Sequence, residues 1–108
     1  MEKSIAMYKT KEGKEPFVEW ITSLKDKTSK GRIEVRVERI KQGNYGDHGR
    51  FGGILEIKMH FGKGYRIYCG EDGDIVVVLL CGGDKSSQDK DIRKALEYWE
   101  DYHDQKKI

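Results

Sequence analysis

Three apolar segments joined by two short turns limit what this chain can fold into more than any other feature. Residues 54–61 alternate between apolar and polar side chains, as expected of a strand with one buried face. Residues 65–69 and 75–81 form two further apolar segments, and the second contains six consecutive aliphatic residues. Asp72-Gly73 between them is a strong hairpin signal. The sequence therefore predicts an antiparallel meander of three strands.

Amphipathic helices are predicted before and after this meander. Residues 4–8 favour a first strand, and Pro16 then suits the first turn of a helix. That helix has its apolar residues at helical spacing: Phe17, Trp20, Ile21 and Leu24. A second helix is capped by Thr28 or Ser29 and ends before Gly43. Its apolar residues also alternate as in a strand, but the capping signal and a length of about three turns favour a helix.

The remaining segments are a glycine-rich loop and a final helix. Residues 43–53 contain five glycines and are predicted to be a loop. After the last strand, Ser86 and Asp89 resemble a capping box. The helix that follows has an apolar stripe: Ile92, Ala95, Leu96, Trp99 and Tyr102. The predicted fold is a single α+β domain over residues 1–108, in the order β-α-α-β-β-β-α. We expect an antiparallel sheet of about four strands, with two N-terminal helices and one C-terminal helix on one face.

Charge and cysteine content narrow the class of protein. The 108 residues suffice for one domain. Lysine and arginine number 21 and aspartate and glutamate 19, so a net charge of +2 hides many charges whose placement matters. The chain shows no apolar run of the ~20 residues that a membrane span needs, no signal-peptide pattern and no disulfide framework. We expect a soluble, cytoplasmic domain without a membrane partner.

The expected registers divide the side chains of the meander between two faces. A three-residue loop at 62–64 pairs Phe61 with Tyr65, and the second turn places Arg66 opposite Leu79. The face under the helices then has these residues: Leu55, Ile57, Met59, Tyr65, Ile67, Cys69, Val76, Val78 and Leu80. The opposite face has polar residues over an apolar floor: Glu56, Lys58, His60, Arg66 and Tyr68, with Val77 and Leu79. A polar face is ordinary for a solvated sheet, whereas the apolar floor indicates that something covers this face or binds there.

Three segments carry a resemblance to a known family. They are Gly-Ile-Leu-Glu-Ile-Lys at 53–58, Gly-Tyr-Arg-Ile-Tyr at 64–68, and Val-Leu-Leu-Cys-Gly-Gly-Asp-Lys-Ser-Ser-Gln-Asp at 78–89. Together, and in the same element order, they resemble the RelE/HigB superfamily of toxins from bacterial toxin–antitoxin (addiction) modules, in its phage-related branch. The resemblance covers nearly the whole chain. It implies a RelE-like fold and a ribosome-dependent endoribonuclease (an mRNA interferase) without metal or cofactor, and a cognate antitoxin that is often a helix-turn-helix protein.

The resemblance also implies which residues act. Arg66 matches an arginine of the central strand, and Lys85 matches a lysine after the last strand. Lys58 stands where relatives often have arginine, and lysine is a point charge that lacks the fork of arginine. RNA is cut when its 2′-OH attacks the adjacent phosphate, so protons must move and negative charge must be stabilised. We expect Arg66 to stabilise that charge and Lys58 and Lys85 to hold phosphates. His60 is a candidate for proton transfer, with a plain exposed histidine as the alternative.

Further residues are candidates for RNA contact, each with a plainer alternative. Tyr68 can stack on a base or form part of a wall. Arg50, in the glycine-rich loop, can touch RNA or remain solvated. Arg32, Arg36 and Arg39 recur along one side of the second predicted helix. They can bind RNA phosphates, dock an acidic antitoxin segment or form a solvated face. The alternative function for the whole chain is a non-catalytic antitoxin- or RNA-binding module with the same fold.

Overall fold

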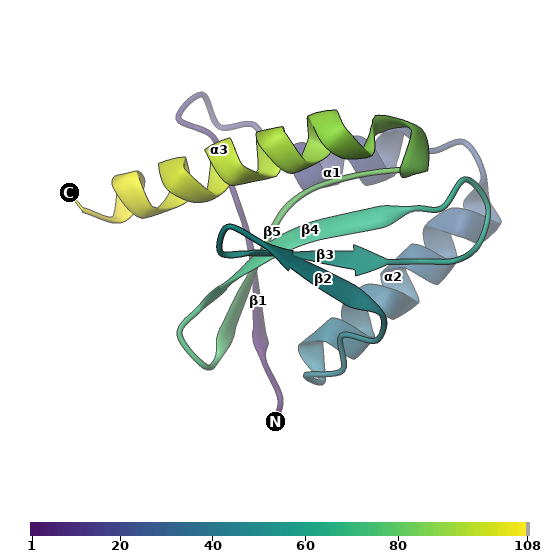
Figure 1. The fold of residues 1–108 in the computed structure, drawn as a ribbon, viewed down its shortest axis with the longest axis horizontal. Coiled ribbons are helices and arrows are strands. Elements are labelled where there is room, and N and C mark those ends of the chain that lie inside the picture. Colours follow the sequence, from purple (N-terminus) through teal and green to yellow (C-terminus); the bar gives the residue numbers. More distant parts are fainter. Residues whose placement is uncertain (108) are drawn as a thin grey trace.

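A five-stranded mixed sheet forms the centre of the fold in the computed structural model, which describes residues 1–107 (Figure 1). The strand order is β1-β5-β4-β3-β2, with β1 parallel to β5 and the other neighbouring pairs antiparallel. The elements are β1 (Ser4–Met7), α1 (Pro16–Ser23), α2 (Lys27–Lys41), β2 (His48–Phe51), β3 (Ile54–Lys58), β4 (Arg66–Asp72), β5 (Val76–Gly83), the short 3-10 helix η1 (Lys85–Ser87) and α3 (Gln88–Lys106). The α+β class and the three predicted helices are confirmed, and the sheet has one more strand than the predicted order.

Helices cover both faces of the sheet, not one as the sequence led us to expect. On one face, Phe17 of α1 and Ile33 and Ile40 of α2 pack in a cluster with the inward residues of β3, β4 and β5. On the other face lies α3, whose Ala95 is fully buried in a second cluster with Tyr68 (Figure 1). α3 therefore covers the face that we predicted to be polar, and it packs there on Val78 and Leu80 instead of the predicted floor of Val77 and Leu79. No helix within residues 1–107 combines the length and the apolar character needed to cross a membrane.

The additional strand, β2, lies in the segment that we expected to be a loop. It pairs with β3 from His48 opposite Ile57 to Phe51 opposite Ile54. Gly52 and Gly53 join the two strands with φ angles of 51° and 92°. Two consecutive residues at positive φ make the tight hairpin turn that glycine allows. The glycines that suggested a loop therefore include a hairpin turn, and the four residues before that turn extend the sheet.

The register between β3 and β4 is shifted by two residues from the expected one. Ile57 pairs with Ile67 and Lys58 with Arg66, because the connection between the strands is longer than three residues. A hydrogen bond of 3.0 Å from the Met59 amide to the Tyr65 carbonyl closes this connection. A shift of two keeps every side chain on its predicted face. It also moves His60 out of the strand and into the connection, so His60 does not face Arg66 across the sheet.

The register between β4 and β5 is shifted by an odd number, and this reverses the predicted faces of β5. Cys69 pairs with Leu79 rather than with Val76, and an irregularity follows between Tyr68 and Cys69. The clusters show the consequence, since Leu79 packs under α1 and α2 and Leu80 packs under α3. The reason is the turn, which is one residue longer than the Asp-Gly signal indicates and ends with Asp72 opposite Val76.

Two helices begin at aspartates that we did not predict as caps. Asp26 accepts a hydrogen bond of 3.0 Å from the Thr28 amide at the start of α2. Asp84 accepts one of 2.8 Å from the Ser86 amide, and with Ser87 it forms a capping box at η1. A side-chain oxygen at this position satisfies amides that have no partner inside the helix. The cap of α2 is therefore Asp26 and not Thr28 or Ser29 as predicted. The capping box begins at Asp84, two residues before the predicted Ser86.

Candidate nucleic-acid interface

Cationic side chains gather where α2, the β3–β4 connection and η1 meet. Two open hollows lie there, side by side, and share His60 and Phe61. The first, of about 360 Å³, is named the arginine hollow and is lined by Arg32, Val35, Arg36, Arg39, His60 and Phe61. The second, of about 560 Å³, is named the Arg66 hollow and is lined by His60, Phe61, Gly62, Lys63, Gly64, Arg66 and Lys85. Together they form a continuous surface with six arginine or lysine side chains, which suits an anionic ligand.

Arg66 is held in place by its own backbone neighbours. Its Nη1 donates hydrogen bonds to the Gly64 carbonyl at 2.9 Å and to the Tyr65 carbonyl at 3.3 Å. Its Nε lies 3.8 Å from Oε2 of Glu56, and Arg66 is only 7% exposed. The register argument placed this side chain away from the core, and that expectation is wrong. The side chain is buried up to the point where it lines the Arg66 hollow.

Glu56 is buried next to Arg66, behind the residues that line the hollow, and was not among our predicted site residues. It is fully buried, and its Oε2 accepts hydrogen bonds from the Tyr68 hydroxyl at 3.0 Å and from Nε2 of Gln88 at 2.8 Å. Within residues 1–107, its Oε1 and the Nε of Arg66 have no hydrogen-bond partner. Removal of one charge from a buried pair of opposite charges leaves the other without compensation, which is strongly destabilising. In the sequence Glu56 alternates with apolar residues as an exposed strand residue does, so no sequence signal indicated that it is buried.

Tyr68 lies in the apolar cluster under α3 and lines neither hollow. Its side chain is fully buried, and burial and then the Glu56 carboxylate raise its pKa above the ordinary value for a phenol. A nucleobase cannot reach this ring, so stacking by Tyr68 is corrected and the alternative of a wall residue fits the structure. The physical reason is α3, which covers this face of the sheet.

His60 lies at the border of the two hollows and is exposed. Its Nε2 is 2.6 Å from Oδ2 of Asp47, and this hydrogen bond holds the pKa of the Asp47 carboxyl below its usual value. This hydrogen bond to the carboxylate orients the imidazole. Asp47, just before β2, is a second residue of the site that sequence reasoning missed.

The two candidate lysines are placed differently. Lys85, the first residue of η1, is exposed and lines the Arg66 hollow, and its amide donates to the Lys63 carbonyl at 3.3 Å. Lys63, in the β3–β4 connection, lines the same hollow and was not predicted. Lys58 is half-buried opposite Arg66 in the sheet, but it lines neither hollow. Arg66, Lys85 and His60 therefore line one hollow, and Lys58 does not.

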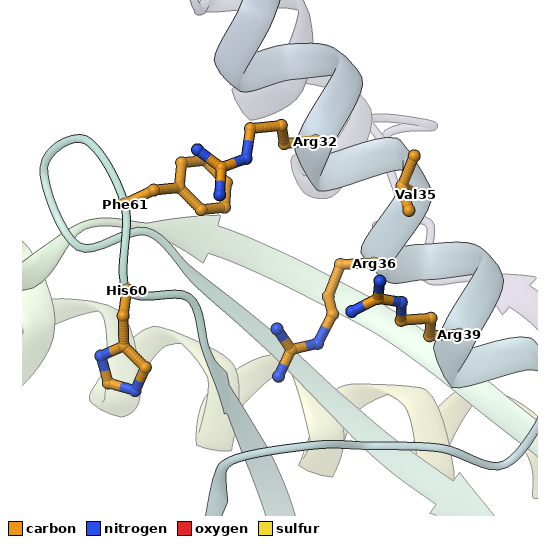
Figure 2. A pocket seen from close by; sticks show the side chains of 6 residues that line it. All are labelled: Arg32, Val35, Arg36, Arg39, His60 and Phe61. Carbon is orange, nitrogen blue, oxygen red and sulfur yellow. The ribbon is translucent and has the colours of Figure 1, made fainter.

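The α2 arginines face the β3–β4 connection (Figure 2). The guanidinium carbon of Arg32 lies 3.9 Å from the centre of the Phe61 ring. Arg36 donates from Nη2 to the Tyr45 carbonyl at 3.2 Å, and burial and then the nearby charge of Arg39 lower its pKa. Arg50 is different, because it lines neither hollow and pairs with Glu71 at 3.0 Å on β4. The three predicted helix arginines thus form one surface, and Arg50 is corrected to an ion pair elsewhere on the sheet.

The part of the chain that the structure describes, residues 1–107, has no group of three or more histidine, cysteine, aspartate or glutamate side chains placed to hold a metal ion. The cysteines Cys69 and Cys81 are buried free thiols in different apolar clusters. The groups available for chemistry at the two hollows are guanidinium, ammonium and imidazole groups. Such groups bind phosphates and stabilise negative charge, and the imidazole can also transfer a proton.

Comparison with known proteins shows a relative that covers most of the chain. No family model matches the chain, and no solved structure matches it. A Haemophilus influenzae protein, described as an uncharacterized protein, is 44% identical to this chain over 80 residues. The match covers 73% of this chain and 81% of the relative. At that identity and coverage, this chain belongs to the same family as the H. influenzae protein.

Proposed function

We propose that this chain is the toxin of a toxin–antitoxin module, a ribosome-dependent endoribonuclease that cuts messenger RNA in the cytoplasm and is neutralised by a cognate antitoxin of the helix-turn-helix type. One observation carries the proposal. Arg66, Lys85 and His60, which lie far apart in the sequence, line the same open hollow. A fixed guanidinium, a mobile ammonium and an imidazole around one hollow are the groups that metal-independent RNA cleavage needs.

The proposed reaction uses the RNA itself as the nucleophile. The 2′-oxygen loses its proton to a base and attacks the adjacent phosphorus. The bond from phosphorus to the 5′-oxygen breaks, and that oxygen takes up a proton as it leaves. The products are a 2′,3′-cyclic phosphate and a free 5′-hydroxyl. Negative charge grows on the phosphate oxygens in the transition state, so fixed donors at that point accelerate the step.

The geometry suggests a role for each side chain. Arg66 stabilises the phosphate charge, because its bonds to the Gly64 and Tyr65 carbonyls fix the guanidinium before substrate arrives. Lys85 is exposed and flexible and holds a phosphate in position. His60, oriented by Asp47, exchanges a proton with the reacting oxygens.

A non-catalytic binding module is the second candidate, and one observation favours it. Most of the Arg66 side chain is engaged with its own backbone and with Glu56, as in a structural ion pair. In that case the hollows bind RNA or an antitoxin segment without cutting RNA.

Cleavage of ribosome-bound mRNA by the purified chain tests the proposal. Primer extension maps the cuts, and the chemistry of the 3′ ends identifies a cyclic phosphate. We expect Arg66→Lys, which keeps the charge beside Glu56 but loses the fork, to lower the cleavage rate about 100-fold or more. Lys85→Ala should lower it less. Lys14→Ala is the matched control, since Lys14 lies in the β1–α1 loop, which packs beside the C-terminal half of α3.

Two results would decide between the candidates. If wild-type protein leaves ribosome-bound mRNA intact and does not arrest growth on expression, the nuclease proposal is wrong. If wild-type protein cuts and Arg66→Lys cuts at the same rate, the role of Arg66 is wrong and the nuclease activity must be assigned to other residues.

A further inference from the structure

We propose that the arginine hollow is a binding site for one nucleotide of single-stranded RNA, with the base stacked on Arg32 and the phosphate held between Arg36 and Arg39. This inference rests on the proposed function, which makes RNA the ligand, and adds where and how a nucleotide beside the cut is held. The Arg66 hollow takes no part in this contact.

The stacking surface is already built. The guanidinium of Arg32 lies over the Phe61 ring, with its central carbon 3.9 Å from the ring centre. Phe61 in turn packs against Tyr65, with the two ring centres 5.7 Å apart. Arg32 is exposed, so the outer face of its plane is free for a ligand (Figure 2). Guanidinium planes and aromatic rings are the surfaces on which proteins stack unpaired bases.

The phosphate position is indicated by charge. The guanidinium groups of Arg36 and Arg39 point the same way from α2 into the hollow (Figure 2). Among residues 1–107 neither group has a carboxylate partner within ion-pair distance. Burial and then the charge of Arg39 lower the pKa of Arg36, and the more distant Asp47 carboxylate opposes this shift. Two like charges held near each other repel, and an anion bound between them removes that repulsion. A phosphate oxygen matches the geometry of arginine donors.

The two hollows share His60 and Phe61, and this shared border orders the nucleotides. A strand that crosses it places one phosphate near Arg66 and Lys85 and a neighbouring nucleotide in the arginine hollow. An acidic protein segment would satisfy the arginines but would leave the Arg32–Phe61 plane without a planar partner. The planar surface therefore favours RNA as the occupant.

Fluorescence anisotropy with a short labelled 2′-O-methyl RNA tests the site at low ionic strength. This probe has no free 2′-OH and cannot be cut. A second probe has the same backbone with abasic residues. We expect Arg32→Lys, which keeps the charge and removes the plane, to weaken binding of the base-containing probe about tenfold and to leave the abasic probe unaffected. Phe61→Leu should act in the same direction.

Lys94→Ala is the control for loss of a cation beside an aromatic ring, since Lys94 lies over Tyr98 on α3, which packs on the opposite face of the sheet from α2. It should bind both probes as wild type does. Equal weakening of both probes by Arg32→Lys, or no weakening of either, would overturn the stacking site. Displacement of the RNA by a polyglutamate peptide at equal concentration would also overturn it, because the occupant would then be an acidic protein segment.

The assay separates this inference from the proposed function. It contains no ribosome and an RNA that cannot react, so it measures the site even if the chain cuts nothing. Conversely, if the Arg32→Lys protein cuts mRNA at the wild-type rate and binds both RNA probes as wild type does, the proposed nuclease function stands and the proposed stacking site is wrong.

Discussion

Arg66 and Glu56 form the most deeply buried ion pair among residues 1–107. Glu56 is fully buried and Arg66 is 7% exposed. Hydrogen bonds from Tyr68 and Gln88 satisfy one carboxylate oxygen, but the only positive charge within ion-pair distance in residues 1–107 is that of Arg66. The residue that we propose for phosphate chemistry is therefore also needed for stability.

Arg66→Ala should lower the free energy of unfolding by about 3–5 kcal/mol, because it leaves the Glu56 charge buried without compensation. Urea denaturation followed by circular dichroism measures this change. Lys85→Ala, on an exposed side chain, should stay within about 0.5 kcal/mol of wild type. The double variant Arg66→Ala, Glu56→Gln should recover part of the loss, since a neutral amide replaces the buried charge. An Arg66→Ala protein as stable as wild type would contradict this dependence of Glu56 on Arg66.

At the scale of the elements, α3 is fastened to the sheet by carboxylates near its C-terminal end. Asp72, at the end of β4, accepts hydrogen bonds from Lys106 and from the Tyr102 hydroxyl, the latter at 2.7 Å. Asp101 accepts one of 2.6 Å from Tyr8. These bonds hold the pKa of both carboxyls below the usual value, led by Lys106 for Asp72 and by Tyr8 for Asp101.

The stability that these carboxylates contribute should be lost in acid. A pKa that is lower in the folded state stabilises the fold above the unfolded pKa, and the contribution disappears as the pH falls through the folded pKa. We expect hydrogen exchange in the last turns of α3 to accelerate relative to the core as the pH falls from about 5 to about 2. In the Asp72→Asn and Asp101→Asn proteins, exchange in the last turns of α3 should already be faster relative to the core at neutral pH. Acid should change this relative rate little. Equal pH dependence in wild type and both variants would contradict the assignment.

The elements also show what the sequence could and could not predict. The helices were predictable because apolar residues at i, i+3 and i+4 leave few alternatives, as in α1 from Pro16 onward. The side chains of β5 were assigned to the wrong faces because one extra turn residue reverses a strand, and neither the longer turn before Val76 nor the irregularity beside Cys69 is visible in the sequence. β2 was missed because its hairpin turn has the same glycine composition as a loop.

For the whole molecule, the distribution of charge matters more than its sum. The net charge is +2, yet the two hollows bring Arg32, Arg36, Arg39, Lys63, Arg66 and Lys85 onto one connected surface. If RNA binds this surface as proposed, counter-ions leave both the surface and the RNA, and the affinity then depends on salt.

Single-stranded RNA should therefore bind with a steep salt dependence in spite of the small net charge. Each phosphate contact contributes a slope of about −0.7 to a plot of log K against log salt concentration. We expect Arg36→Gln, Arg39→Gln to reduce the magnitude of the slope by about that amount for the one phosphate it loses. Anisotropy titrations over a range of KCl concentrations give the slope. An unchanged slope in this double variant would place the RNA elsewhere on the molecule.

The candidate site was predictable only in part, because some of its residues depend on how distant segments pack together. Arg66 and Lys85 could be proposed from the resemblance, and the arginine ridge from its spacing on a helix. Glu56, Gln88 and the burial of Tyr68 could not, because they depend on α3 lying over the second face of the sheet. A side chain that looks solvent-exposed in an alternating strand becomes part of the interior when a distant segment covers it.

The hydrogen bond from Gln88 to Glu56 joins the first residue of α3 to the buried carboxylate beside Arg66. The position of α3 is set by packing along its whole length, including Ala95, which is fully buried. The restriction on substitutions at the hollow therefore extends beyond the residues that line it. A bulkier side chain at Ala95 would displace the start of the helix, loosen Glu56 and shift Arg66. Sequence change in α3 is thus limited by the geometry of a guanidinium that α3 does not itself contact.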